Sequence, residues 1–293
     1  MERIIIDQRE GQRLDNFLFQ IYKSTPNSHV YRMLRKGRIR VNGKVCRDNC
    51  YRLVKNDVLS MPTPINDASR LIPNDALVDK VRHMIVQESE DFWLLNKPPR
   101  ICVHQSERDV FGVVEVMRHI FGEAHLVHRI DRNTSGCLMI AKHYSSLAKW
   151  QAIWRDRGVE KKYILLAEGP WRSNSEVLVV EKPLLRQNND QGGAKVVVSS
   201  KGKPSKTVFR LKKRYGRYLL LEAEIITGRT HQIRVHAASM GFPIVGDGRY
   251  GVANNPVIDC MFLHAESLTF PAENNLQLTC EMTASQKACL QRL

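Results

Sequence analysis

The sequence predicts an α+β protein of two domains, in which a small basic module precedes a larger domain with a largely antiparallel, mixed β-sheet and flanking helices. Three observations support this fold class. The chain has 293 residues, which at about 150 residues per domain indicates two domains. Its composition, 43% hydrophobic and 26% charged, is that of a globular protein. Segments with helical and strand periodicity alternate irregularly, without the βαβ order of a parallel sheet.

The charge indicates a polyanionic partner. The formal net charge is +15 at pH 7, and residues 1–60 alone contain 13 basic and 6 acidic residues. An excess of this size most often marks a protein that binds nucleic acid.

The sequence also predicts a cytoplasmic protein without a membrane segment. Its longest apolar runs fall far short of the roughly 20 residues that span a bilayer, and the N-terminus lacks a signal-peptide pattern. The seven cysteines are scattered without a C-x-x-C pair, so we expect neither disulfides nor a zinc ribbon.

Residues 13–60 have the pattern of two helices followed by a hairpin. Apolar residues recur at helical spacing through 14–22, and a second, basic helix ends at Gly37. Asn42 and Gly43 follow alternating residues, which predicts a type I′ hairpin turn.

Basic side chains gather in this module. The planar guanidinium fork of arginine suits phosphate groups, so we expect a surface that binds RNA or DNA. Its candidate residues are Arg32, Arg35, Lys36, Arg38, Arg40 and Lys44. The pattern R-L-D-x-F-L, a basic helix and R-K-G-x-I-x-V-N-G resembles the S4 RNA-binding domain.

A change in composition sets the expected domain boundaries. Three prolines and two Asn-Asp pairs lie between residues 61 and 80, with little periodicity. We therefore expect an S4-like domain at 1–62, a linker at 63–82 and a larger domain at 83–293.

The larger domain mixes short strands with amphipathic helices. Hydrophobic periodicity, turn residues and terminating glycines define the segments. In order they are strands at 84–86 and 92–95, a helix at 110–121, a strand at 137–140, a helix at 147–154, a strand at 163–166, an antiparallel pair at 206–214 and 217–226, and a helix from Thr230 to Gly241.

A polar loop at 128–136 is the first candidate for chemistry. Asp131 lies between two arginines, close to small hydroxyl residues and just before a buried strand. Ion pairing favours the charged carboxylate, and an oriented carboxylate can act as a nucleophile or base. A structural salt bridge within the loop is the alternative interpretation.

The second candidate is the polar helix start at 227–236. Helix N-termini attract anions, and Thr230 and Arg234 share one helical face. His231 and His236 are five positions apart, not the four of a helical zinc site, so no metal site is expected.

Taken together, the motifs resemble the RluA-type pseudouridine synthases. With the S4-like domain in front, the chain is most similar to the branch that acts on large-subunit ribosomal RNA. Arg100 departs from the family pattern, because the motif N-K-P usually continues to glycine there. The matching segments are H-R-I-D-R-N-T-S-G, K-x-Y, G-R-T-H-Q-I-R-x-H, G-D-x-R-Y-G and F-L-H-A, in this order.

The resemblance implies a catalytic centre. Asp131 would attack the ribose, either directly at C1′ or after a glycal forms. Arg234 would pair with Asp131 and keep it charged, and Tyr163 would stack on the target base and take the C5 proton. No cofactor is required, because no redox step occurs, and since the sequence shows no cluster of metal ligands, we expect no metal in the chemical step.

The resemblance also implies an RNA partner, and we expect the protein to act as a monomer. Arg129 would fill the gap left when the target uridine leaves its stack, since this chemistry requires an extruded base. His128, Arg229, Thr230 and His231 would join the RNA-binding surface.

Other functions remain open at this point. A non-catalytic S4-type RNA-binding or ribosome-assembly protein would explain the charge, but the set of Asp131, Tyr163 and Arg234 argues against it. A synthase acting on transfer RNA is a further alternative. A metal-dependent nuclease would usually need several clustered carboxylates, which the sequence does not show.

Overall fold

The protein forms two compact units in a computed structural model. One unit comprises Met1–Ile72 together with His143–Ala148, and the other comprises the rest of the chain. Each has its own hydrophobic core. The residues that the structure describes are 2–7, 9–22, 27–63, 72–105, 111–156, 158–188, 194–251 and 257–293.

The first unit is a small α+β module, as its sequence predicts. Its elements are β1 (Glu2–Ile5), α1 (Leu14–Ile21), α2 (Asn27–Arg35), β2 (Arg40–Val41), β3 (Lys44–Val45) and β4 (Val58–Met61). The strands lie in the order β1-β4-β2-β3 with antiparallel pairing. Asn42 and Gly43 have φ angles of 50° and 80°. The type I′ turn requires positive φ at both positions, so the predicted hairpin is confirmed.

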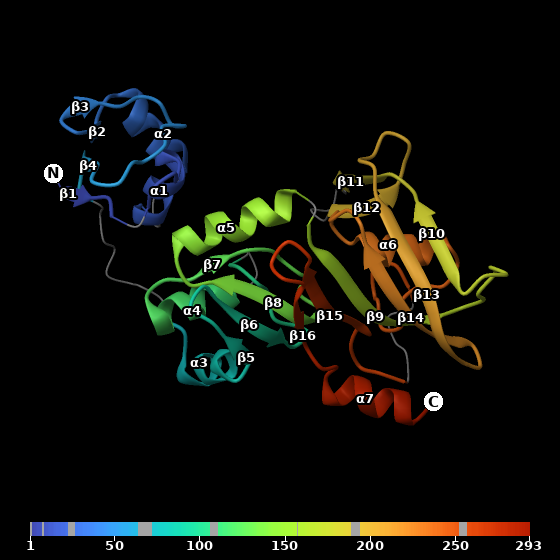
Figure 1. Ribbon diagram of the computed structural model, residues 1–293. Helices are drawn as coiled ribbons and strands as arrows, with labels where there is room; N and C mark the ends of the chain where they lie inside the picture. Colours follow the sequence, from blue (N-terminus) through green and yellow to red (C-terminus); the bar gives the residue numbers. More distant parts are fainter. Residues whose placement is uncertain are drawn as a thin grey trace. The chain divides into compact units, whose positions relative to one another are not determined.

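The second unit contains most of the secondary structure (Figure 1). Each strand and helix predicted for the larger domain has a counterpart, although residue 110 of one predicted helix lies outside the described residues, and the helix observed at 144–155 belongs to the first unit as far as Ala148. The elements are α3 (Asp75–Arg82), β5 (Ile85–Glu88), β6 (Phe92–Lys97), α4 (Val113–Phe121), β7 (His125–Leu126), β8 (Ser135–Ala141), α5 (Tyr144–Arg155), β9 (Glu160–Glu168), β10 (Val177–Glu181), β11 (Leu184–Asn188), β12 (Ala194–Val198), β13 (Lys206–Tyr215), β14 (Tyr218–Ile225), α6 (Gln232–Ser239), β15 (Leu263–Phe270), β16 (Leu276–Thr279) and α7 (Ala284–Gln291).

A large mixed sheet organises this unit. Its strands follow the order β10-β13-β14-β9-β15-β8-β6-β5, with β16 beside β15 and β7 beside β8. Within the described residues β15 and β8 are the one parallel pair, so the predicted largely antiparallel sheet is confirmed. Strands β11 and β12 form a separate hairpin.

Strand β9 shows how the two faces of the sheet are used. Successive side chains of a strand point to opposite faces. Leu165 and Ala167 pack in the same core as Ile233 and Ala237 of α6. On the other face, Ile164 and Leu166 share a core with Cys289 of α7. Tyr163 packs against the α6 core, which places it on the same side as α6.

The linker expected at 63–82 is partly helical. Its residues 75–82 form α3, and the side chain of Asn74 accepts a hydrogen bond from the backbone N–H of Leu77 as an N-cap. Val81 is fully buried. An Asn cap and one buried position stabilise this short helix. Two prolines and two Asn-Asp pairs in the same stretch are typical of a linker, and for this reason the sequence did not predict a helix there.

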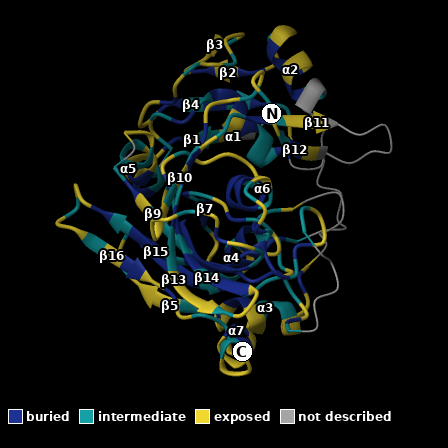
Figure 2. Ribbon diagram, turned by 90° about the vertical axis from the view of Figure 1, so that its right-hand side faces the viewer, coloured by how far each residue is buried: buried dark blue, intermediate teal, exposed yellow. Residues whose placement is uncertain are grey.

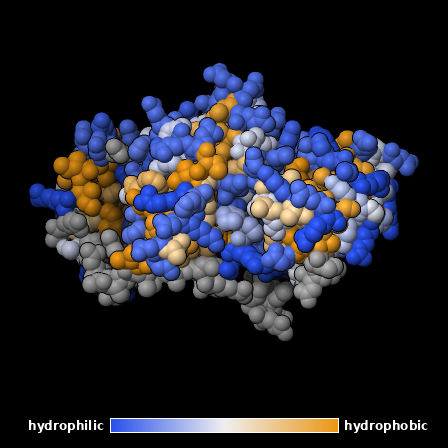
Figure 3. Space-filling view, turned by 90° about the horizontal axis from the view of Figure 1, so that it is seen from below, coloured by the Kyte–Doolittle hydropathy of each residue, from blue (hydrophilic) through white to orange (hydrophobic). Residues whose placement is uncertain are grey.

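The helices differ in how far they are buried, and the surface is mostly hydrophilic on one face. Figure 2 shows α6 in the buried interior of the second unit, whereas α2 carries exposed residues. Figure 3 shows one face on which hydrophilic residues predominate and hydrophobic ones form separate patches. In the described part of the chain, no helix is both long enough and apolar enough to span a membrane.

Candidate active site

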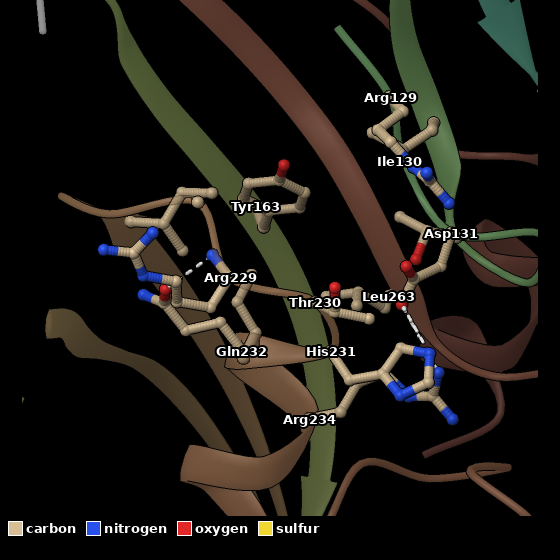
Figure 4. A pocket seen from close by; sticks show the side chains of 14 residues that line it. Arg129, Ile130, Asp131, Tyr163, Arg229, Thr230, His231, Gln232, Arg234 and Leu263 are labelled. Atoms are coloured by element: carbon tan, nitrogen blue, oxygen red, sulfur yellow. Dashed lines mark hydrogen bonds and ion pairs between the residues drawn. The ribbon is translucent and has the colours of Figure 1, made fainter. Parts of the chain in front are cut away.

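A pocket in the second unit collects residues from the motifs singled out in the sequence (Figure 4). It lies where the loop before β8, strand β9 and the start of α6 meet. Asp131, Tyr163 and Arg234 all line it, although Asp131 and Arg234 are 103 positions apart in the chain. Among the described residues the lining is Arg129, Ile130, Asp131, Thr134, Tyr163, Ile225, Gly228, Arg229, Thr230, His231, Gln232, Ile233, Arg234 and Leu263.

The loop that carries Asp131 is fixed by hydrogen bonds from a buried lysine. The Nζ of Lys97 donates to the backbone carbonyls of Pro98, Ile101 and Arg132, at 2.8, 3.0 and 3.1 Å. Burial lowers the pKa of Lys97 to about 7, and the negative charge of Asp131 opposes this shift. Three carbonyl acceptors match the three N–H bonds of an ammonium group. Lys97 thus fixes the loop at the residue that follows Asp131.

The end of the same loop requires a glycine. Gly136 has a φ of 104°, and a Cβ added there would lie 2.1 Å from the carbonyl oxygen of Ala265. This close approach arises from the parallel pairing of β8 with β15, in which Gly136 faces Ala265. Backbone packing therefore sets where the loop ends and the strand begins.

Arg234 lies between two carboxylates. Its Nη1 donates to Oδ2 of Asp131 at 3.3 Å. Its Nε and Nη2 donate to the two carboxylate oxygens of Asp247, both at 2.8 Å. The predicted pairing of Arg234 with Asp131 is present, but the shorter, two-fold contact is made with Asp247.

Asp247 is buried, with a side chain that is 1% exposed. Burial by itself would raise the pKa of Asp247, but the hydrogen bonds and charge of Arg234 bring it below its ordinary value. The backbone N–H groups of Arg249 and Tyr250 also donate to this carboxylate. A charged Asp247 thus fixes the plane of the Arg234 guanidinium, and one N–H of that group remains directed at Asp131.

Tyr163 stands across the pocket from Asp131 (Figure 4). Strand β9 holds it between β14 and β15, where it pairs with Ala223 and Ala265. Burial raises the pKa of Tyr163 well above its ordinary value, and the nearby Asp131 carboxylate adds to the shift. Its phenol is therefore neutral at physiological pH.

His231 contacts both Asp131 and a residue of the G-D-x-R-Y-G motif. Its Nε2 lies 3.7 Å from Oδ2 of Asp131, and its Nδ1 lies 2.8 Å from the hydroxyl of Tyr250. Burial lowers the pKa of His231 to about 4, although Asp131 opposes the shift. The imidazole is therefore neutral near pH 7.

The other residues expected to bind RNA near the catalytic centre occupy different places. Arg129, Arg229 and Thr230 are exposed and line the pocket. His128 does not line it: its ring stacks on Trp154, and its Nε2 accepts the backbone N–H of Met139. Burial lowers the pKa of His128 to about 3. The structure thus places His128 as a neutral group that anchors the loop to β8.

The basic residues predicted to bind RNA in the first unit are all exposed. They belong to α2 and the β2–β3 hairpin or lie directly beside them, and the pocket of the second unit contains none of them. They are Arg32, Arg35, Lys36, Arg38, Arg40 and Lys44.

The two histidines of the 227–236 motif point to different surroundings. His236 is fully buried and contacts the hydroxyls of Ser205 and Thr207 and the carbonyl oxygen of Lys182. Across the residues that the structure describes, no group of three or more His, Cys, Asp or Glu side chains could hold a metal ion.

The turn at Arg100 keeps a glycine-like backbone despite the unusual residue. Its φ is 69°, in the left-handed region that glycine adopts most easily. The carbonyl oxygen of Arg100 accepts a hydrogen bond from Nε of Arg132 at 3.2 Å. The turn is therefore formed and is tied to the loop of Asp131.

The sequence by itself predicts no role for Lys97, Asp247 or Tyr250. All three lie in the motifs N-K-P and G-D-x-R-Y-G, and this is the local signal that points to them. Their contacts join residues far apart in the chain, and spacing within a motif carries no information about such contacts.

Known proteins with similar sequences share both parts of this arrangement. A family model described as RNA pseudouridylate synthase matches residues 91–239, and the S4 domain model matches 12–59. The ribosomal large subunit pseudouridine synthase C of Haemophilus ducreyi is 40% identical over 91% of this chain and 86% of its own. The protein of the same name from Escherichia coli strain K12 is 38% identical over 97% of this chain and 93% of its own.

Solved structures agree with the fold of the second unit. The human RNA pseudouridylate synthase domain containing 4 matches with a TM-score of 0.60 and 24% identity, over 74% of this chain and 95% of its own. The human RNA pseudouridylate synthase domain containing 1 matches with a TM-score of 0.59 and 26% identity, over 70% of this chain and 86% of its own. This chain, which has a pocket lined by Asp131, Tyr163 and Arg234 and an S4 domain, belongs to the RNA pseudouridylate synthase family.

Proposed function

We propose that this pseudouridine synthase isomerises specific uridines in large-subunit ribosomal RNA. The observation that carries the proposal is the carboxylate of Asp131, held beside the buried Arg234 and across the pocket from Tyr163. The substrate class is supported by the relatives from Haemophilus ducreyi and Escherichia coli, whose names specify the large ribosomal subunit.

In the proposed reaction Asp131 initiates cleavage of the glycosidic bond. The C1′–N1 bond breaks, either by direct attack of the carboxylate at C1′ or through a glycal, and uracil leaves as a stabilised anion. The base then rotates, and a C1′–C5 bond forms while the Asp131–C1′ bond breaks on the direct route, or while the proton that was lost from C2′ returns on the glycal route. The proton on C5 is lost and N1 becomes protonated, so the reaction is an isomerisation that consumes no oxidant or reductant.

Arg234 and Tyr163 prepare the pocket for this step. Arg234 stabilises the negative charge of Asp131 when the entering base displaces water from it. Tyr163 offers the face of a neutral ring on which uracil can stack. Because burial raises the pKa of Tyr163, stacking is favoured over proton removal by a phenolate.

The pocket requires a base that has left its stack. C1′ and C5 are not accessible within stacked RNA, so the target nucleotide must be extruded. Arg129 lies exposed at the pocket beside Asp131, where it can fill the vacated space. Arg229 and Thr230 complete the RNA-facing part of the site, His231 lies in the pocket beside Asp131, and His128 acts only by anchoring the loop.

We further propose that the two parts of the chain divide the work. Residues 1–62 supply phosphate contacts through their exposed basic side chains, which adds affinity more than specificity. Residues 83–293 carry the chemistry. We expect the protein to act as a monomer in the cytoplasm, with no metal in the chemical step.

Mapping of pseudouridine in ribosomal and transfer RNA tests this function. Cells lacking the protein should lose pseudouridine at one or more positions of large-subunit RNA. Wild-type protein and Asp79→Asn, a control at an exposed position of α3, should restore it. Asp131→Asn should not, because it removes the nucleophilic charge and keeps the shape.

Each other outcome contradicts the proposal in a different way. A loss confined to transfer RNA would show that the substrate class is wrong. Unchanged pseudouridine in all RNA would favour a non-catalytic RNA-binding role. Full activity of purified Asp131→Asn would remove Asp131 as the nucleophile.

A further inference from the structure

A line of polar contacts runs from the β12 backbone to Asp131. The backbone N–H of Val196 donates to the hydroxyl oxygen of Tyr250 at 3.1 Å. That hydroxyl lies 2.8 Å from Nδ1 of His231. The opposite ring nitrogen, Nε2, lies 3.7 Å from Oδ2 of Asp131. Two side chains thus connect the β11–β12 hairpin to the catalytic carboxylate.

The chemistry of the partners determines which atoms carry protons. A carboxylate only accepts hydrogen bonds, so the ring nitrogen that faces Asp131 is the one favoured to carry a proton. The buried ring is neutral near pH 7 and has one proton, which leaves Nδ1 of His231 as an acceptor. The hydroxyl of Tyr250 therefore accepts from Val196 and donates to His231.

The backbone of His231 is held in an unusual conformation. It precedes α6 with φ 55° and ψ 21°, in the left-handed region. Non-glycine residues adopt this region rarely, and such strain persists where surrounding contacts determine it, often at functional sites. This backbone conformation turns the ring of His231 toward Asp131 (Figure 4).

The contacts on Asp131 are unequal. Arg234 and His231 both approach Oδ2, at 3.3 and 3.7 Å. Among the described residues no side chain binds Oδ1 of Asp131. Arg234 therefore holds Oδ2 by a hydrogen bond, and the ring of His231 lies beside the same oxygen, beyond hydrogen-bond distance but close enough for its N–H dipole to attract the carboxylate.

We propose that His231 and Tyr250 are positioning residues that orient Asp131, so that Oδ2 is anchored and Oδ1 is the oxygen that attacks the ribose. Tyr250, itself fixed by the backbone of Val196, keeps His231 in the Nε2–H form. This inference rests on the proposed function, because it takes Asp131 as the nucleophile.

The proton position can be measured without any activity assay. Long-range proton–nitrogen NMR spectra of the full-length protein should show His231 as the neutral Nε2–H tautomer at pH 7. In Tyr250→Phe the donor to Nδ1 is lost, and we expect the Nδ1 signal to shift. A neutral Nδ1–H tautomer in the wild type would overturn the proposal.

Two replacements of His231 separate positioning from stability. In His231→Gln the amide nitrogen can occupy the place of Nε2 and still present an N–H to Asp131. In His231→Asn the shorter side chain does not reach, but asparagine tolerates the left-handed backbone better than glutamine. We therefore expect the Asn variant to have the higher melting temperature and the Gln variant to react faster.

The rates should be single-turnover rates at saturating enzyme. We expect His231→Asn and Tyr250→Phe each to lose about tenfold, because the N–H that faces Asp131 is removed or is no longer fixed in place, with an unchanged Kd for RNA. Tyr218→Phe is the matched control, because its hydroxyl bonds to Arg217 outside the pocket. It should retain the wild-type rate.

Three results would contradict the inference. A rate order that follows the melting temperatures would show that His231 acts only on stability. A weaker Kd with an unchanged saturated rate would make His231 a simple RNA contact. A full rate in Tyr250→Phe would remove Tyr250. If instead Asp131→Asn remains active, Asp131 is not the nucleophile and the premise of this inference fails, whereas the tautomer measurement still stands by itself.

Discussion

Replacing Asp247 by Asn should destabilise the second unit strongly. In the wild type the Asp247 carboxylate accepts two hydrogen bonds from Arg234, both at 2.8 Å. The side chains of Arg234 and Asp247 are 8% and 1% exposed. Asparagine has nearly the same shape, but it loses the charge and turns an amide N–H toward one guanidinium N–H.

The size of the effect follows from the burial of the pair. Removing one partner of a buried ion pair leaves a charge without compensation, which costs about 3–5 kcal/mol. Asp131 remains 3.3 Å from Nη1 of Arg234 and takes over part of the charge. We therefore expect the lower end of that range, about 3 kcal/mol of unfolding free energy.

Tryptophan fluorescence during urea unfolding is the appropriate assay. All four tryptophans lie in the second unit, so the signal does not follow the first unit. Glu181→Gln is the matched control, since it breaks an exposed ion pair with Lys206 whose side chains are 62% and 43% exposed. An exposed pair of this kind contributes about 0–1 kcal/mol.

A loss below about 1 kcal/mol in Asp247→Asn, equal to that of the control, would refute the reasoning. The double variant Asp247→Asn with Arg234→Gln gives a second check. Removing both charges leaves no buried cation without a partner, so the double variant should be more stable than the sum of the two single losses predicts.

Three further predictions concern the site and its surroundings. Arg234→Lys should retain more single-turnover activity than Arg234→Ala, because it keeps a cation beside Asp131 but loses the two-fold contact; equal rates would contradict this. EDTA should not reduce the rate on a short RNA that folds without magnesium, and rescue by a transition metal would be the contrary result. Stability should fall as the pH drops from about 6.5 to 4, since His128 and His231, with pKa values lowered to about 3 and 4, stay neutral when folded but take up protons when unfolded. Each contributes up to about 1.4 kcal/mol per pH unit. Urea midpoints at pH 7 and pH 5 measure this, and His128→Asn should reduce the slope by about one proton.

Much of the local structure was determined by the sequence alone. Helical periodicity predicted α1, and the pair Asn42-Gly43 predicted the β2–β3 hairpin. Both signals depend only on neighbouring residues and on backbone preferences, so they can be read from the sequence. Motif order along the chain indicated the family and the residues of the pocket, which the fold then placed together.

Helix α3 and the start of α6 show where local signals were insufficient. The prolines and Asn-Asp pairs around α3 are typical of a linker, so the sequence did not predict this helix. Burial of Val81 in the tertiary structure stabilises it. The sequence predicted that α6 begins at Thr230, whereas it begins at Gln232. The left-handed backbone of His231, which delays the start of the helix, could not be inferred from residue type.

The partners of the charged groups were decided only by the tertiary structure. From the sequence, Arg234 had one expected partner, Asp131; in the fold its two-fold contact is with Asp247, and His128 anchors the loop instead of lining the pocket. Asp131, Arg234 and Asp247 come from three separate segments, and their distances depend on how β8, β9 and α6 pack. Side-chain chemistry is encoded residue by residue, whereas the choice among several possible ion-pair partners depends on burial and orientation, which exist only once the chain has folded.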